Sequence, residues 1–87
     1  MIERKKRRCE IDIFADILYL ANKGGVKKTT IVYKANLNFK IVEGFLSSLL
    51  EGGLIEFSDK LYETTDRGGT FLYHYKEIQK LTTIEPV

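Results

Sequence analysis

Basic side chains gathered in two stretches give this sequence its clearest chemical signal. Residues 1–8 hold five bases against Glu3, a charge of +4, and residues 23–40 hold five lysines and no acid, a charge of +5. Residues 9–22 and 41–87 carry −3 and −4. Pooled positive charge of this kind favours a polyanionic partner. The alternative is a solvated basic tag beside a surface that is rich in lysine.

Other kinds of chemistry lack the residues they require. Cys9 lies between an arginine and an acidic segment, and the only histidine, His74, follows 65 positions later. A cysteine nucleophile needs a nearby base and an orienting group, and a zinc site needs more ligands than these two. We therefore expect no enzymatic activity and no bound metal, and we expect Cys9 to be a buried thiol. The glycine pairs do not form a phosphate-binding loop, so no cofactor is expected.

The size and composition of the chain fit one small domain. It has 87 residues and an apolar fraction of 44%. A chain of this size hides roughly 60–65% of the surface that its unfolded form exposes, so its stability is modest unless a partner adds burial. No run approaches 18 apolar residues, and no apolar stretch follows the basic start. We expect a cytoplasmic protein that does not enter a membrane.

Apolar residues at helical spacing predict three helices, over residues 9–22, about 29–35 and about 38–51. A glycine pair ends the first helix, and an extended piece, residues 26–28, leads to the second, which Thr29 or Thr30 can cap. Asn36 tolerates a left-handed backbone, and Asn38 is a good N-cap for the third helix.

The apolar period then changes from that of a helix to that of strands. Residues 54–57 and 61–64 indicate a β-hairpin with a three-residue tip at 58–60, and Thr65 can cap a last helix. Two helices joined by a tight turn form a helix-turn-helix unit, and a hairpin directly behind it forms a wing. The predicted fold is mainly α with a small β-hairpin, a winged helix-turn-helix. Its parts are a basic arm (1–8), a winged-helix domain (9–65) and a C-terminal helix (66–87).

Three motifs resemble the small archaeal winged helix-turn-helix DNA-binding proteins. They are KKTTIVYKANLNF at residues 27–39, FLSSLLEGGLI at 45–55 and YETTDRGGTFL at 62–72. Together with the basic start and the isoleucine-rich first helix, the resemblance covers residues 4–80. It implies binding of double-stranded DNA as a homodimer, in transcription control or chromatin organisation, and thus a location at the nucleoid.

Proteins of this family usually dimerise through a long C-terminal helix that pairs as an antiparallel coiled coil. The segment here has about twenty residues, which leaves room for a short seam only. The seam expected from the spacing consists of Phe71, His74, Tyr75, Ile78 and Leu81. The alternative is a short helix that folds back on its own domain.

DNA binding would place the third helix in the major groove and basic residues on phosphates. The candidate DNA-binding residues are Arg4, Lys5, Lys6, Arg7 and Arg8 in the arm, and Lys28, Thr30, Lys34, Asn38, Lys40, Gly44, Ser47 and Lys60 in the folded part. The arm would lie on the backbone or in the minor groove. Gly44 and Ser47 are small enough to let base edges approach.

Several of these assignments have plain alternatives. The arm can be a solubilising tail, Asn38 a structural cap only, and the strip with Gly44 and Ser47 a solvent-facing surface. Glu43 repels phosphate, although a carboxylate can accept from a cytosine amino group. The third helix has no arginine or glutamine for bidentate base reading, which predicts weak sequence specificity or readout of DNA shape.

A winged helix that binds another protein instead of DNA is the competing interpretation. A recognition helix with one lysine and one glutamate suits that role as well. The position of the lysines in space distinguishes the two. Convergence of Lys28, Lys34, Lys40 and the arm on one face favours DNA, and scattering favours a protein partner.

Overall fold

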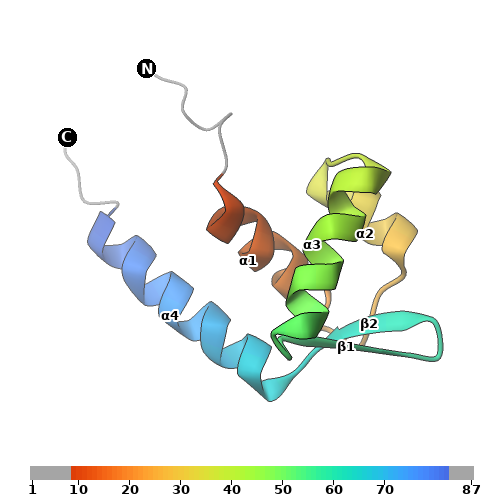
Figure 1. Cartoon of the computed structure of the whole chain (residues 1–87). Coiled ribbons are helices and arrows are strands. Elements are labelled where there is room, and N and C mark those ends of the chain that lie inside the picture. Colours follow the sequence, from red (N-terminus) through yellow and green to blue (C-terminus); the bar gives the residue numbers. More distant parts are fainter. Residues whose placement is uncertain (1–8, 83–87) are drawn as a thin grey trace.

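The predicted order of helices and strands is confirmed in a computed structural model, which describes residues 9–82 (Figure 1). The elements are α1 (Glu10–Leu20), α2 (Lys28–Ala35), α3 (Phe39–Glu51), β1 (Ile55–Ser58), β2 (Leu61–Thr64) and α4 (Asp66–Thr82). None of the helices within residues 9–82 combines the length and the apolar character that crossing a membrane requires. The fold is mainly helical with one antiparallel hairpin, as the winged helix-turn-helix prediction requires.

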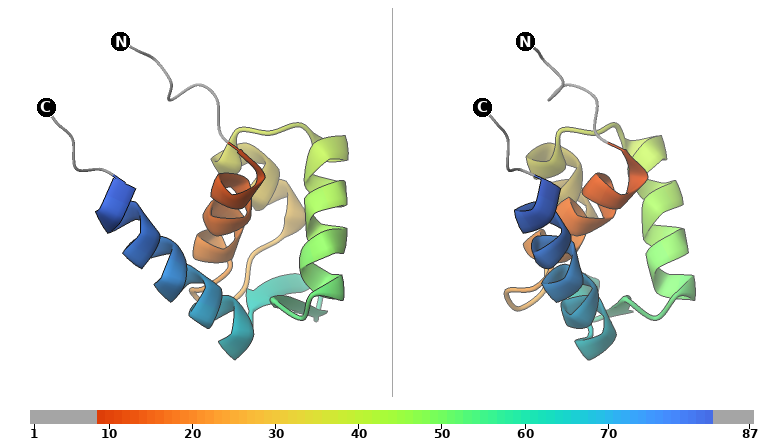
Figure 2. Two further views of the ribbon diagram at one scale, coloured as in Figure 1. Left: turned by 60° about the vertical axis from the view of Figure 1, so that its left-hand side comes forward. Right: turned by 90° about the vertical axis from the view of Figure 1, so that its left-hand side faces the viewer.

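The core lies where α1, α2 and α3 meet above the hairpin (Figure 2). Each helix contributes the apolar positions that its spacing places on one face, such as Leu18 from α1, Ile31 from α2 and Leu49 from α3, all fully buried. Ile55 closes the core from β1, and Leu72 closes it from α4. Full burial of a side chain of this size contributes about 1.5–3 kcal/mol.

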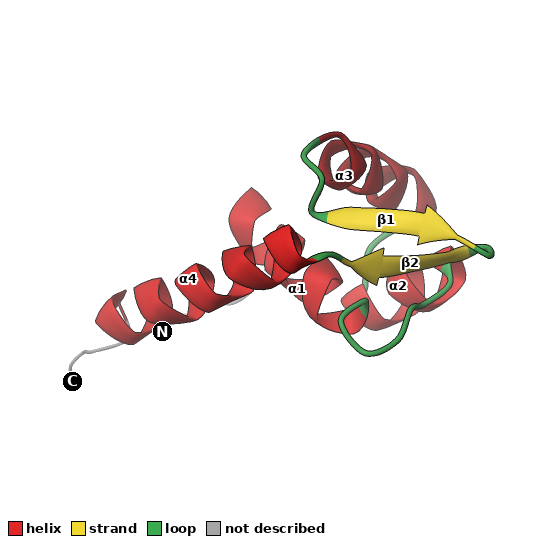
Figure 3. Cartoon of the chain, turned by 90° about the horizontal axis from the view of Figure 1, so that it is seen from below, coloured by secondary structure: helices red, strands yellow, loops and turns green. Residues whose placement is uncertain are grey.

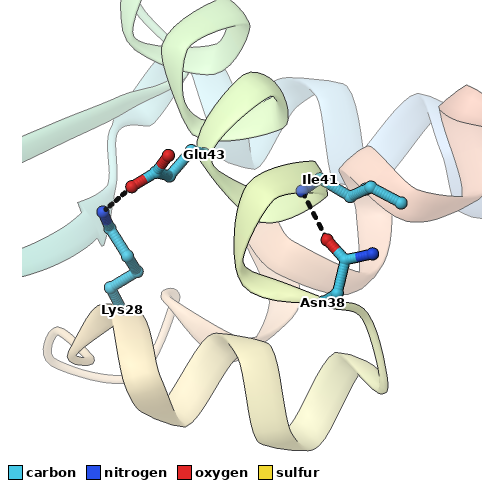
Figure 4. A network of polar contacts seen from close by, with 4 residues as sticks. All are labelled: Lys28, Asn38, Ile41 and Glu43. Carbon is cyan, nitrogen blue, oxygen red and sulfur yellow. Dashed lines mark hydrogen bonds and ion pairs between the residues drawn. The ribbon is translucent and has the colours of Figure 1, made fainter.

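The joint between α2 and α3 forms as the two asparagines predict. Asn36 is left-handed, with φ 59° and ψ 49°, and ends α2. The Oδ1 atom of Asn38 accepts a hydrogen bond from the backbone N–H of Ile41 at 2.8 Å, which satisfies one of the free amides of α3 (Figure 4). These two local effects set where α3 begins and leave its first turn facing outward.

The expected cap of α2 by Thr29 or Thr30 is wrong. Lys27 is the N-cap, and it makes no side-chain cap bond. Its carbonyl accepts from the amides of Thr30 and Ile31, at 3.1 and 3.2 Å, so both threonines already lie inside the first turn. Pairing of Val26 with Tyr62 in β2, through two backbone bonds of 2.9 and 2.8 Å, fixes where the extended piece ends and lets the helix start early.

The hairpin is tighter than predicted. Ser58 pairs with Leu61, so the tip consists of Asp59 and Lys60 alone and not of three residues. Both tip residues have positive φ, 53° and 63°. Two-residue hairpins favour such turns because their twist matches that of the strands. The turn extends the ladder by one pair and exposes Lys60 at the outer end of the wing.

The start of α1 corrects the prediction for Cys9. This residue is the N-cap of α1 and is exposed, not buried. Its backbone N–H and its thiol both donate to Oδ2 of Asp12, at 3.2 and 3.3 Å. Cysteine is usually buried because of its apolar character. Here Cys9 is exposed because it precedes the first turn of α1, at the end of the helix. The helix also ends at Leu20, earlier than the predicted 22.

A dense junction attaches α4 to the rest of the fold. Thr65 caps α4 by accepting from the N–H of Gly68 at 3.1 Å, as predicted, and its hydroxyl donates to the carbonyl of Gly53 at 2.7 Å. The hydroxyl of Thr64 donates to the carbonyl of Leu18, also at 2.7 Å. From this junction α4 runs outward beyond the other helices (Figure 3). The molecule is accordingly elongated, with extents of 46 × 26 × 20 Å.

Candidate nucleic-acid interface

The outer face of α3 carries small and polar side chains. Because Val42, Leu46 and Leu49 are buried, helical geometry turns Lys40, Gly44 and Ser47 to solvent, and all three are exposed. A Cβ atom added to Gly44 would meet nothing within 4 Å, and its φ is not positive. Neither packing nor backbone conformation within residues 9–82 therefore requires glycine there. The open space at Gly44 lets a partner approach the backbone of α3 closely at this point.

An ion pair joins this face to the start of α2 (Figure 4). The ammonium of Lys28 lies 3.0 Å from Oε2 of Glu43 and 5.3 Å from the ring centre of Phe39. The positive charge of Lys28 therefore offsets the negative charge of Glu43, the residue of α3 that was expected to repel DNA phosphates. Partly exposed pairs of this kind contribute about 0–1 kcal/mol, so the pair adds little to the stability of the fold.

Lys34 and Thr30 point to another side of α2. They line a shallow groove between α1 and α2, together with Asp16, Tyr19 and Lys23. Lys28 and Lys34 are six residues apart, which on an α-helix places them about 120° from each other. The lysines of the folded part therefore do not all gather on one face: Lys28 and Lys40 lie beside α3, whereas Lys34 lies with Lys23.

Sequence reasoning did not single out one strongly exposed aromatic residue of α2. Tyr33 on α2 is 82% exposed, the highest value among the large apolar side chains in the described part of the chain. Its position was predictable, because Ile31 and Ala35 are the buried residues of α2 and Tyr33 lies between them on the opposite side. A tyrosine hydroxyl is a common donor to phosphate oxygens.

The remaining DNA-binding candidates lie at the wing, in the arm and at the start of α3. Lys60 is exposed at the tip of the wing, beside Asp59. The Oδ1 atom of Asn38 makes the cap bond with Ile41 described above. The five arm residues lie outside the described residues; they are Arg4, Lys5, Lys6, Arg7 and Arg8.

The proposed dimer seam on α4 divides into two parts. Phe71 and Tyr75 pack inward: the Phe71 ring lies 6.4 Å from that of Phe14 on α1, and the Tyr75 hydroxyl donates to Oδ1 of Asp12 at 2.5 Å. His74 is exposed, and Ile78 and Leu81 are 56% and 77% exposed. The first turns of α4 thus fold back on their own domain, and the later turns present apolar side chains to the surroundings.

The bond between Tyr75 and Asp12 predicts an alkaline loss of stability. Burial first, and then the hydrogen bond to Asp12, raises the pKa of Tyr75 above its usual 10.0. The folded state therefore keeps the proton more tightly than the unfolded state, so this contribution is complete below pH 10 and declines as the pH rises above it. In chemical denaturation between pH 7 and pH 11, the stability advantage of the native chain over Tyr75→Phe should shrink above pH 10. A constant difference across that range would contradict the assignment.

Comparison with known proteins gives one family match and a small set of relatives. A family model described as winged helix-turn-helix matches residues 7–83. An uncharacterized protein of Methanocaldococcus jannaschii, MJ0290, is 32% identical over 75 residues, which are 86% of this chain. The chain spans only 36% of the length of that relative. A second uncharacterized protein of the same organism, MJ0287, is 24% identical over 95% of this chain and 86% of its own length.

A solved structure resembles this chain in both fold and sequence. The crystal structure of Sso10a-2, a DNA-binding protein from Sulfolobus solfataricus, superposes with a TM-score of 0.70 at 26% sequence identity. The match covers 85% of this chain and 81% of that protein. The predicted resemblance to small archaeal winged helix-turn-helix proteins is therefore confirmed.

Proposed function

Because the chain belongs to the winged helix-turn-helix family, we propose that it is a non-enzymatic protein that binds double-stranded DNA. Its role would be that of a transcriptional regulator or an architectural factor at the nucleoid in the cytoplasm. The observation that carries this proposal is the outer face of α3, which exposes Lys40, Gly44 and Ser47 and lies beside Lys28. The similarity to Sso10a-2, which is described as a DNA-binding protein, supports it.

In this proposal α3 enters the major groove and lysines hold the phosphates. Lys40, in the first turn of α3, lies where the free amides at a helix N-terminus also attract an anion. Lys28 reaches the backbone from α2 with a second N–H of its ammonium while the first stays on Glu43, and Lys60 reaches it from the wing. Each lysine placed on a phosphate releases counterions, which gives affinity for any sequence. Thr30 and Lys34 lie farther round α2, so their contact with the same duplex requires the DNA to bend toward α1.

We further propose that the protein is a homodimer that associates through α4. The exposed part of the expected seam, formed by His74, Ile78 and Leu81, would supply the contact, while Phe71 and Tyr75 hold α4 on its own domain. Apolar side chains that are more than half exposed on a protruding helix favour a partner that covers them. Two copies joined in this way would present two recognition helices to one duplex.

A charge deletion on α3 tests the proposal. Lys40→Ala should weaken binding to a fluorescent mixed-sequence duplex by roughly five- to tenfold at about 100 mM salt, because one phosphate contact is lost. Lys80→Ala is the matched control: Lys80 is an exposed lysine on α4 that pairs with Glu77 at 3.4 Å, far along the chain from α3. The control should bind like the native protein. Equal losses in both variants would show that only net charge matters and that α3 is not the binding element.

A protein partner is the second candidate, and one observation favours it. Lys34 lies with Lys23 and Asp16 in the groove between α1 and α2, apart from Lys28 and Lys40. Such a separation of the basic residues is what the protein-interaction alternative predicts. In the same titration, no binding of the native chain to the duplex at about 50 mM salt would reject DNA binding and support this alternative.

A further inference from the structure

We propose that Glu43 is the base-reading residue of α3 and that it makes the protein prefer a cytosine in the major groove. This inference rests on the proposed DNA binding and adds a sequence preference to it. The sequence alone suggests the opposite, because α3 lacks the residues that usually read guanine or adenine and because an acid repels phosphate. The ion pair with Lys28 changes that balance.

Glu43 lies in the middle of an exposed stripe of α3. Lys40, Glu43 and Ser47 follow one another at steps of three and four residues, so they lie along one stripe of the helix. All three are exposed, and the side chain of Glu43, in the middle, is 57% exposed. Gly44 beside it leaves open space. A helix that enters the groove with this stripe first brings the Glu43 carboxylate to the base edges.

The negative charge of Glu43 is offset by Lys28. An unpaired carboxylate would be repelled by the phosphates on both sides of the groove. Here Lys28 donates to Oε2 at 3.0 Å, and its contact with the Phe39 ring keeps the ammonium on this side of α2. Within residues 9–82 no hydrogen bond reaches Oε1 of Glu43. The pair therefore offers a nearly neutral unit that still has a free acceptor.

The donors and acceptors on the base edges of the major groove favour cytosine as the partner of a carboxylate. An ionised carboxylate only accepts hydrogen bonds. Guanine presents two acceptors in the major groove, thymine presents an acceptor and a methyl group, and adenine presents an acceptor next to its amino donor. Cytosine presents an amino donor alone, and glutamate accepts from it. Serine and lysine on the same stripe do not discriminate in this way, since Ser47 can donate or accept and Lys40 is a flexible point charge.

Selection from a random duplex library tests the inference, using the native protein, Glu43→Gln and Glu51→Gln. The native protein should select a site with one fixed cytosine, and replacing that C·G pair should weaken its binding about tenfold. Glu43→Gln should select adenine at the same position, because glutamine pairs bidentately with adenine. Glu51→Gln removes an exposed acid from the last turn of α3 and should keep the cytosine. The Lys28–Glu43 pair adds little stability, so the Glu43→Gln variant should fold and show a native circular dichroism spectrum.

The possible results distinguish failure of the cytosine preference from failure of DNA binding itself. Tight binding by the native protein with all four base pairs within about twofold of one another would overturn the role of Glu43 and leave DNA binding in place. A cytosine preference that survives in Glu43→Gln would overturn it as well. Failure of the native protein to bind any duplex at about 50 mM salt would reject both.

Discussion

Replacing Gly68 with alanine should destabilise the fold by about 3 kcal/mol or more. Gly68 is buried at the start of α4, where the chain passes the end of the hairpin. An added Cβ would lie 2.6 Å from Cγ2 of Thr64 and closer still to the carbonyl oxygen of Leu54. That carbonyl cannot retreat easily, because it accepts the backbone N–H of Thr65 at 3.0 Å. The alanine variant must therefore displace α4 or break the junction.

The neighbouring glycine provides the control. Gly69 has nothing within 4 Å of an added Cβ and has helical backbone geometry. Gly69→Ala should leave stability unchanged or raise it by up to about 1 kcal/mol, through the better helix propensity of alanine. Urea denaturation followed by circular dichroism measures both. If Gly68→Ala unfolds at the same urea concentration as the native chain, the contacts described at this junction are wrong.

Affinity for DNA should fall by roughly three orders of magnitude between 50 and 200 mM salt, the value for about six phosphate contacts. The folded part offers Lys28 and Lys40 at α3 and Lys60 at the tip of the wing, and the basic arm supplies the remaining contacts in the proposed complex. Fluorescence anisotropy with a mixed-sequence duplex at several salt concentrations gives the slope directly. A loss of less than about tenfold over this range would mean that phosphate contacts contribute little.

Removal of residues 1–8 isolates the contribution of the arm. Without the arm the rest of the chain has a net charge of −2, so the truncated protein should bind every duplex more weakly and with a flatter salt dependence. Lys80→Ala removes one exposed positive charge from α4, should bind like the native protein, and serves as a control for the loss of a charge outside the arm. Binding by the truncated protein that equals that of the whole chain would refute the arm's role.

Local signals in the sequence predicted most of the fold. Helical spacing of apolar residues located the helices, and side chains that act on their own backbone located the ends, as Asn36, Asn38 and Thr65 show. The errors arose where contacts with segments distant in the sequence determine where an element begins or ends. Pairing of Val26 with β2 moved the start of α2 back past Thr29.

The candidate site was predictable to the same extent and for the same reason. The exposed strip of α3 follows from its helical period, so Lys40, Gly44 and Ser47 lie where the spacing places them. The ion pair between Lys28 and Glu43 joins residues 15 positions apart and depends on how α2 crosses α3. The spacing of apolar residues along the sequence gives no information on that crossing. The need for glycine at position 68 is likewise invisible, since it comes from the carbonyl of Leu54, brought there by the hairpin.

The contacts of α1 bear on how the chain is made. This first helix is held by segments that the ribosome releases much later: Leu18 accepts from Thr64, and Asp12 accepts from Tyr75, 46 and 63 residues downstream. While only α1 to α3 have emerged, the faces of α1 that meet β2 and α4 stay open to water, and the nascent chain exposes apolar surface there. We expect the domain to reach its native state only once α4 has been released, so that folding waits for translation of its final helix.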